Sequence, residues 1–65
     1  MDFKLIDKEE GKRQWESSRG DNIFYICEEY SDKTYIVDVF EGKEHVQSEF
    51  VDTFDEGVAF CKEYE

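Results

Sequence analysis

Basic residues are scarce in this chain, and several residue types that mark common functions are rare or missing. The 65 residues contain eight Lys or Arg against eighteen Asp or Glu, with one His, two Cys, four Gly and no Pro. So few bases argue against binding nucleic acid directly or lying on an anionic membrane, since a phosphate backbone requires clustered Lys and Arg. The isolated glycines form no phosphate-binding loop, and no Cys or His pair has zinc-site spacing. We therefore predict no cofactor and no metal.

Long apolar segments are missing too. The longest unbroken apolar run is Ile23 to Cys27, far below the ~20 residues of a membrane span, and the N-terminus has no apolar stretch like that of a signal peptide. Cys27 and Cys61 are widely separated and lie in apolar surroundings, which favours reduced thiols over a disulfide. Although 40% of the residues are charged, 17% are aromatic, which opposes disorder. We predict a folded, cytoplasmic domain.

The negative charge is confined to one part of the chain. Residues 1–20 hold five acids and five bases and sum to zero, whereas residues 21–65 hold thirteen acids and three bases, giving 3 − 13 = −10. Without a proline, an internal repeat or a low-complexity linker, residues 1–65 are predicted to form one small domain. Its anionic segment, 21–65, also carries almost all of the apolar periodicity. Because compaction brings like charges together at a cost in stability, this excess suggests a cationic partner.

Three β-strands are predicted in the anionic segment. Ile23 to Cys27 is rich in β-branched and aromatic residues, as a buried strand prefers. Ser31-Asp32 supplies turn chemistry before a second strand at Thr34 to Glu41. A further turn at Glu41-Gly42-Lys43 leads to a third strand at Glu44 to Val51. Short hairpin connections of this kind predict an antiparallel meander.

The parity of apolar residues predicts the register of this meander. If Ser31-Asp32 is a two-residue loop, Ile26 faces Val37 and Phe24 faces Val39. A second loop of even length then places seven apolar residues on one face: Phe24, Ile26, Tyr35, Val37, Val39, Val46 and Phe50. The other face is mixed: Ile23, Tyr25, Cys27, Ile36, Asp38, Phe40, His45, Gln47 and Glu49. A slip of one residue would scatter the apolar set, so the register should be well specified.

A C-terminal helix is predicted with a clear start. Thr53 and Glu56 have the spacing of a capping box. Phe54, Val58 and Cys61 recur at i, i+4 and i+7 and form one apolar stripe, which should pack on the apolar sheet face. Gly57 weakens such a helix by roughly 1 kcal/mol relative to Ala, unless it permits close packing on the sheet.

The first 20 residues allow two interpretations. Phe3 and Leu5 alternate with Lys4 and Ile6, and a turn at Gly11 followed by a strand around Trp15 would complete a hairpin. Alternatively, Lys8 to Ser17 contains good helix formers, although a helix there would have almost no apolar stripe. We favour the hairpin. The predicted fold is therefore α+β: a three-stranded antiparallel meander with a C-terminal helix on one face, preceded by an N-terminal hairpin. The second face is covered either by this hairpin or by another chain, and we favour the hairpin.

A catalytic site is weakly indicated. His45, the only histidine, is predicted to lie beside Asp38 on the neighbouring strand, and such a pair can act as a base and the group that orients it. A solvated cross-strand pair explains the same two residues more simply. No nucleophile is placed beside them by the sequence. We predict that the chain is not an enzyme.

The excess of carboxylates gives the leading functional hypothesis, a non-enzymatic module that binds a basic protein surface. A rigid sheet that displays carboxylates can imitate the charge of DNA, as small inhibitors of nucleic-acid enzymes do, many of them phage-encoded; the analogy is in charge and size alone. The alternative is a structural subunit or homodimer that buries the second sheet face. The predicted electrostatic contacts are Glu28, Asp38, Glu41, Glu44 and Glu49. The predicted apolar contacts are Ile23, Tyr25, Ile36 and Phe40.

Overall fold

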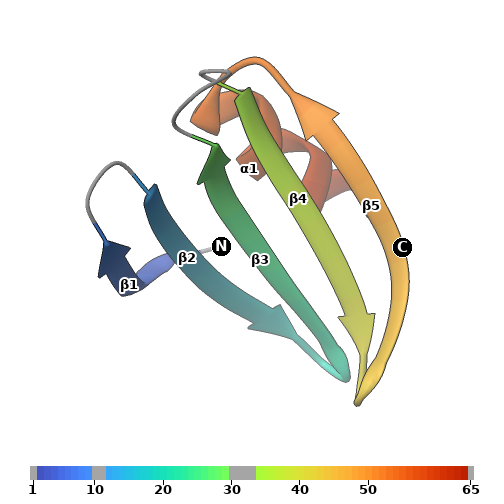
Figure 1. The fold of residues 1–65 in the computed structure, drawn as a ribbon. Helices are drawn as coiled ribbons and strands as arrows, with labels where there is room; N and C mark the ends of the chain where they lie inside the picture. The colour runs from blue at the N-terminus through green and yellow to red at the C-terminus, as the bar shows by residue number, and fades with distance from the viewer. Residues whose placement is uncertain (1, 10–11, 30–33, 65) are drawn as a thin grey trace.

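The computed structural model describes residues 2–9, 12–29 and 34–64, which form a single antiparallel sheet and one helix (Figure 1). The elements in chain order are β1 (Lys4–Glu9), β2 (Lys12–Arg19), β3 (Asn22–Glu29), β4 (Thr34–Glu41), β5 (Glu44–Val51) and α1 (Phe54–Glu63). The strands lie across the sheet in the same order as along the chain. The fold is mostly β, with the helix as its last element.

The predicted three-stranded meander is wrong in its strand count, because the sheet has five strands. The N-terminal strands β1 and β2 pair with each other, as a hairpin requires, but β2 also pairs with β3 from Gln14↔Cys27 to Arg19↔Asn22. The hairpin therefore extends the sheet and does not fold over its second face. A tight turn makes this continuation possible, since Gly20 takes a φ of +62°, which favours glycine. The predicted turns at Gly11 and at Ser31-Asp32 lie outside the described residues.

The register between β3 and β4 is the predicted one. Ile26 pairs with Val37 and Phe24 pairs with Val39, and all four side chains are fully buried. The face that contains them is called the inner face here, and the opposite side of the sheet is called the outer face. Parity alone was sufficient for this pair of strands because no residue is inserted on either side.

The register between β4 and β5 departs from the prediction. Glu41 pairs with Glu44 across the predicted turn, but the pairing shifts by one residue between Val39 and Phe40, so that Val39 faces Gln47. Such a β-bulge puts every later residue of the strand on the opposite face. Phe50 therefore lies opposite Ile36, on the outer face, and is 68% exposed. The predicted inner-face position of Phe50 is wrong, as are the predicted outer-face positions of Gln47 and Glu49. Val46 is the unpaired residue of the bulge and is 40% exposed.

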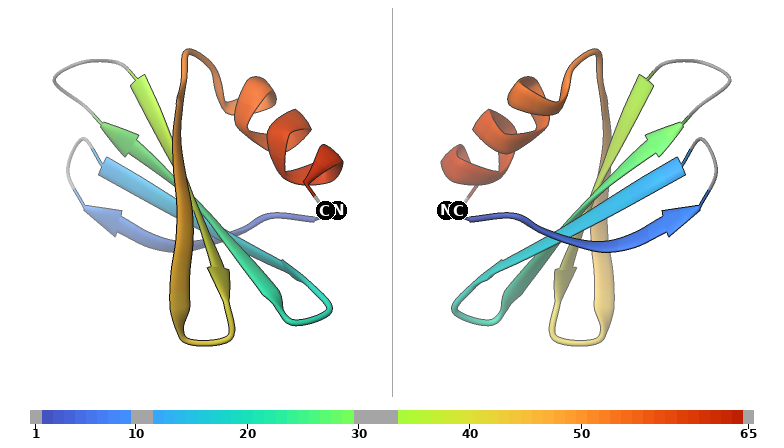
Figure 2. Two further views of the ribbon diagram at one scale, coloured as in Figure 1. Left: turned by 90° about the vertical axis from the view of Figure 1, so that its right-hand side faces the viewer. Right: turned by 90° about the vertical axis from the view of Figure 1, so that its left-hand side faces the viewer.

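The helix packs on the inner face alone (Figure 2). It begins where the capping box predicts, because the Thr53 hydroxyl accepts a hydrogen bond of 3.1 Å from the Glu56 amide. Cys61 is fully buried against the four central strand residues. At the other end of the helix, the Arg19 guanidinium donates hydrogen bonds to the carbonyls of Lys62 and Tyr64. Eight partly buried side chains surround this core: Phe3, Trp15, Tyr35, Val51, Phe54, Val58, Phe60 and Tyr64.

Cys27 and Cys61 form no disulfide, which confirms that expectation. Burial raises the pKa of the Cys61 thiol to about 11, with Arg19 opposing the shift. Because only the thiolate reacts readily, we expect the partly buried Cys27 to react with a maleimide at pH 8 while Cys61 reacts only as fast as the protein unfolds. Mass spectrometry of digests from a labelling time course, with and without urea, measures both rates. Equal rates in native protein would contradict the observed burial of Cys61.

Candidate protein-binding face

The outer face brings together the four apolar residues that the sequence singled out. Ile23 pairs directly with Phe40 across β3 and β4, and Ile36 lies four residue pairs along the same two strands. The Tyr25 and Phe40 rings meet edge to face, with centroids 5.5 Å apart. All four side chains are only partly buried. No element of the described part of the chain covers them, because the helix lies on the other side of the sheet (Figure 2).

Phe50 extends this apolar surface, and sequence reasoning missed it. Its position opposite Ile36 puts a large, mostly exposed ring beside the predicted set. Parity without a bulge had placed Phe50 in the core. The sequence contains no signal for this position, because Phe50 is exposed on the edge strand only as a result of the β-bulge. We call Ile23, Tyr25, Ile36, Phe40 and Phe50 the apolar patch.

A polar cluster interrupts the apolar patch, because Asp38 and Ser48 lie between the Ile23–Phe40 pair and the Ile36–Phe50 pair. The Asp38 Oδ1 atom lies 3.2 Å from His45 Nε2 and accepts a 2.6 Å hydrogen bond from the Ser48 hydroxyl, whose oxygen is 2.9 Å from His45 Nε2. The His45 ring also packs against Phe40, with centroids 5.0 Å apart. Ser48 joins the cluster because the bulge pairs it with Asp38. The sequence therefore predicted the contact of His45 with Asp38 but not the serine.

The geometry of this cluster is not that of a catalytic relay. In a serine–histidine–aspartate relay, the serine and the carboxylate contact different ring nitrogens, so that one nitrogen takes a proton while the other is held. Here both Asp38 Oδ1 and Ser48 Oγ lie against the same nitrogen, Nε2. The His45 side chain is also 47% exposed. The three residues therefore link β4 to β5 and give the outer face a polar, anionic centre.

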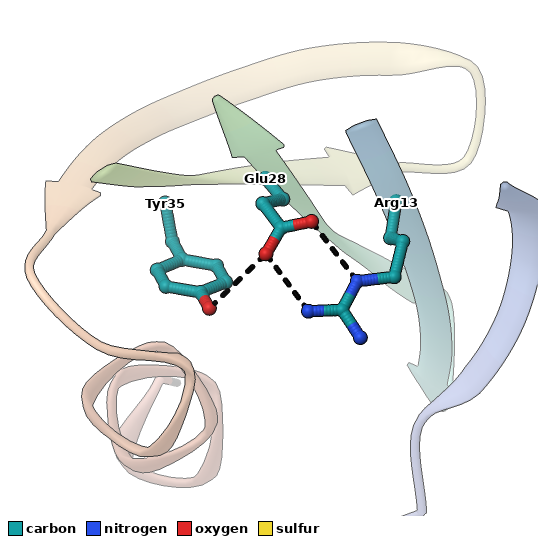
Figure 3. A network of polar contacts seen from close by, with 3 residues as sticks. All are labelled: Arg13, Glu28 and Tyr35. Atoms are coloured by element: carbon teal, nitrogen blue, oxygen red, sulfur yellow. Dashed lines mark hydrogen bonds and ion pairs between the residues drawn. The ribbon is translucent and has the colours of Figure 1, made fainter. Parts of the chain in front are cut away.

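Glu28, one of the predicted electrostatic contacts, is engaged elsewhere. Its two carboxylate oxygens accept hydrogen bonds from Arg13 Nε at 2.9 Å and Arg13 Nη2 at 2.8 Å, and the Tyr35 hydroxyl lies 3.4 Å away (Figure 3). These bonds to Arg13 hold the pKa of Glu28 below its ordinary value and raise that of Arg13. Glu28 pairs with Tyr35 on the inner face. Its charge is therefore compensated within the chain.

The Arg13–Glu28 pair should make stability depend on acid pH. Because the folded pKa of Glu28 lies below its ordinary value of 4.5, the pair stabilises the fold fully above that pH, and this stabilisation is lost as pH falls through the folded pKa. We expect Arg13→Gln to lower the free energy of unfolding at pH 7 and to have a diminishing effect below about pH 4.5. Urea denaturation across pH 3–7, with Lys12→Gln as the control for lost charge, measures this. An effect of Arg13→Gln that is independent of pH would contradict the assignment.

The other predicted carboxylates do not gather on one surface. Asp38 is on the outer face, within the polar cluster. Glu41 and Glu44 face each other across the β4–β5 turn, at one end of the sheet, and both are exposed. Glu49 pairs with Val37, which places it on the inner-face side of the edge strand. Like charges directly opposite each other destabilise a sheet, so the Glu41–Glu44 pair needs a compensating cation more than the others do.

Comparison with protein-family models, curated proteins and solved structures finds no match for this chain. Within the described residues, no helix has the length and apolar character needed to cross a membrane. The functional inference therefore rests on the geometry of the outer face and on the charge of the chain.

Proposed function

We propose that this chain is a non-enzymatic protein-binding module of the cytoplasm, which presents its outer face to a positively charged protein. The carrying observation is the apolar patch, whose five members lie together on three neighbouring strands with nothing over them in the described part of the chain. Exposed apolar surface among polar residues marks interaction sites on proteins. Burying one exposed phenylalanine such as Phe50 favours association by about 1.5–3 kcal/mol before the costs of binding.

The charge around the patch supports a basic partner. Asp38 lies at its centre, and Glu16 lies beside it on β2, where it accepts a hydrogen bond from the Tyr25 hydroxyl. Glu41 and Glu44 lie at the end of the same strands. A partner that sets Lys or Arg side chains among and around apolar ones would complement this arrangement and would be steered towards it at a rate that falls with added salt. Two copies of this chain would instead bring together two molecules of net charge −10.

The irregular edge strands of the sheet favour a partner that contacts the outer face over one that adds a strand to an edge. Strand addition requires a regular edge with unpaired amide and carbonyl groups. Both edge strands have a register irregularity, between Leu5 and Asp7 in β1 and at Val46 in β5. Bulges and charged residues on edge strands are devices that discourage pairing with another chain. The outer face is therefore the better candidate for contact with a partner.

DNA mimicry and homodimer formation are two more specific functions that remain predictions. DNA mimicry is supported by the net charge, but the five named carboxylates lie on both faces and at one end, which supports a basic-rimmed partner more than a single anionic ridge. Homodimer formation is supported by the apolar patch and opposed by like charge. Competition by duplex DNA for a captured partner addresses mimicry, and sedimentation velocity across concentrations addresses the homodimer.

Affinity capture with matched variants tests the proposal. The immobilised baits are wild type, Phe50→Ser on the outer face, and Leu5→Ser, whose side chain is exposed by 45% but lies on β1. We expect wild type and Leu5→Ser to retain a partner that Phe50→Ser does not. We also expect wild type to bind this partner at least about tenfold more weakly at 300 mM salt than at 50 mM, because salt screens the charge pairs. Capture that is equal on all three baits, or salt-independent affinity for the purified partner, would refute it.

A further inference from the structure

A second candidate site lies on the other side of the sheet, between the start of the chain and the helix. An open pocket of about 590 Å³ is formed there by residues from three segments: Asp2 and Phe3, Trp15 of β2, and Phe54, Asp55 and Val58 of α1. We propose that this pocket binds a quaternary ammonium group. The proposal is independent of the outer face, because none of these residues belongs to the apolar patch.

Aromatic rings set at large angles to one another form the walls of the pocket. The Trp15 and Phe54 ring centroids are 4.6 Å apart at an interplanar angle of 58°, and those of Phe3 and Phe54 are 6.2 Å apart at 77°. All three side chains are partly exposed. A quaternary ammonium has no N–H group to donate a hydrogen bond and is recognised by the negative faces of such rings. Trp15 already attracts one cation within the fold, since the Arg13 guanidinium carbon lies 5.1 Å from its ring centroid.

Two carboxylates give the pocket its charge preference. Asp2 and Asp55 both line it, and neither forms an ion pair with any residue that the structure describes. Ca²⁺ and Mg²⁺ need six or more oxygen ligands, which a pocket walled largely by rings does not supply. Aromatic walls with two carboxylates instead match a bulky organic cation, either a free quaternary amine or a trimethylated lysine side chain.

The single tryptophan of the chain makes the pocket directly observable. The probes are choline, its neutral isostere 3,3-dimethyl-1-butanol, and the blocked amino acid N-acetyl-trimethyllysine amide, added at constant ionic strength. Trp15 fluorescence and the NMR signal of its indole N–H report binding. We expect a saturable response in which choline binds at least about fivefold more tightly than the neutral isostere, as the attraction of a cation to aromatic faces requires. Tighter binding of the lysine derivative than of choline would identify a protein side chain as the ligand, and the reverse would identify a free amine.

Two substitutions in the first turn of the helix provide a matched pair. Asp55→Asn removes a pocket carboxylate, whereas Glu56→Gln removes the neighbouring charge, which does not line the pocket. We expect Asp55→Asn to weaken choline binding several-fold and Glu56→Gln to leave it unchanged, with thermal unfolding confirming that both variants are folded. Phe3→Leu, which keeps an apolar wall but removes one ring, should also weaken it. Equal binding of choline and the neutral isostere, no saturable response to either cation, or equal losses from Asp55→Asn and Glu56→Gln would overturn the proposal.

Discussion

Phe24→Ala is expected to lower the free energy of unfolding by about 3–5 kcal/mol, the usual loss for a fully buried phenylalanine. Phe24 lies on β3, in the middle of the sheet, with no exposed surface. Its ring meets Tyr64 edge to face at 5.7 Å, and the Arg19 guanidinium carbon lies 5.7 Å from its centroid. Truncation therefore leaves a cavity and also weakens the attachment of the helix end to the sheet.

The size of the domain makes this effect severe. At roughly 0.05–0.15 kcal/mol per residue, a chain of this length has a total stability of about 3–10 kcal/mol. Phe24→Ala should therefore remove about a third or more of this stability, and a domain in the lower half of the range would be largely unfolded at 25 °C. Far-UV circular dichroism with urea denaturation measures the change. If the variant is unfolded without urea, Phe24→Leu, which leaves a smaller cavity, gives a measurable loss in the same direction.

Phe50→Ala is the matched control, because it removes the same side chain from an exposed position. With 68% of Phe50 exposed, we expect a loss below about 1 kcal/mol. The comparison also tests the β-bulge, since unbroken alternation along β5 would have put Phe50 in the core with Phe24. Comparable losses from the two truncations would contradict the observed register of β5.

Gly57→Leu is expected to destabilise the fold by about 2–3 kcal/mol through overpacking between the helix and the sheet. A Cβ atom built at Gly57 would lie 3.2 Å from both Ile26 Cδ1 and Val37 Cγ2, and 3.5 Å from Val51 Cγ2. The first two distances are already tight, and leucine adds three carbon atoms beyond that point. The higher helix propensity of leucine offsets less than about 1 kcal/mol of this loss.

Ala59→Leu is the matched control for Gly57→Leu, because residue 59 belongs to the same helix but is exposed. We expect it to change the free energy of unfolding by no more than about 0.5 kcal/mol. Gly57→Ala should fall between the two, since the gain in helix propensity opposes a small displacement of Ile26 and Val37. Urea denaturation of the four proteins gives the order. A Gly57→Leu variant as stable as wild type would show that the helix does not rest on the sheet at this residue.

Local sequence patterns were sufficient to predict the structural features that depend on residues close together in the chain. The capping box of Thr53 and Glu56 located the start of the helix, and alternation with a short loop gave the pairing of Phe24 with Val39. The N-terminal hairpin was also favoured over a helix, because a helix there would have almost no apolar stripe. In each case the controlling interaction spans a few residues or one hairpin, so the sequence carries the whole signal.

The candidate binding face was only partly predictable. Ile23, Tyr25, Ile36 and Phe40 were placed together because β3 and β4 pair without a break. Phe50 and Ser48 were not, because one inserted residue in β5 reverses the faces that follow it and nothing in the local pattern marks the insertion. The five carboxylates were chosen by charge, which has no periodicity of its own, and Glu28 proved to be compensated by Arg13, fifteen residues away in sequence.

The scarcity of basic residues, the confinement of the −10 charge to residues 21–65, the helix cap and the β3–β4 register were determined by the sequence alone. The tertiary structure decided that the N-terminal hairpin extends the sheet, so that the outer face has no cover in the described part of the chain. It also decided which carboxylates are compensated and which rings surround the pocket beside the helix. The physical reason is range: composition and capping are local, whereas strand order, a bulge and a pocket depend on backbone and side-chain contacts between segments far apart in the chain.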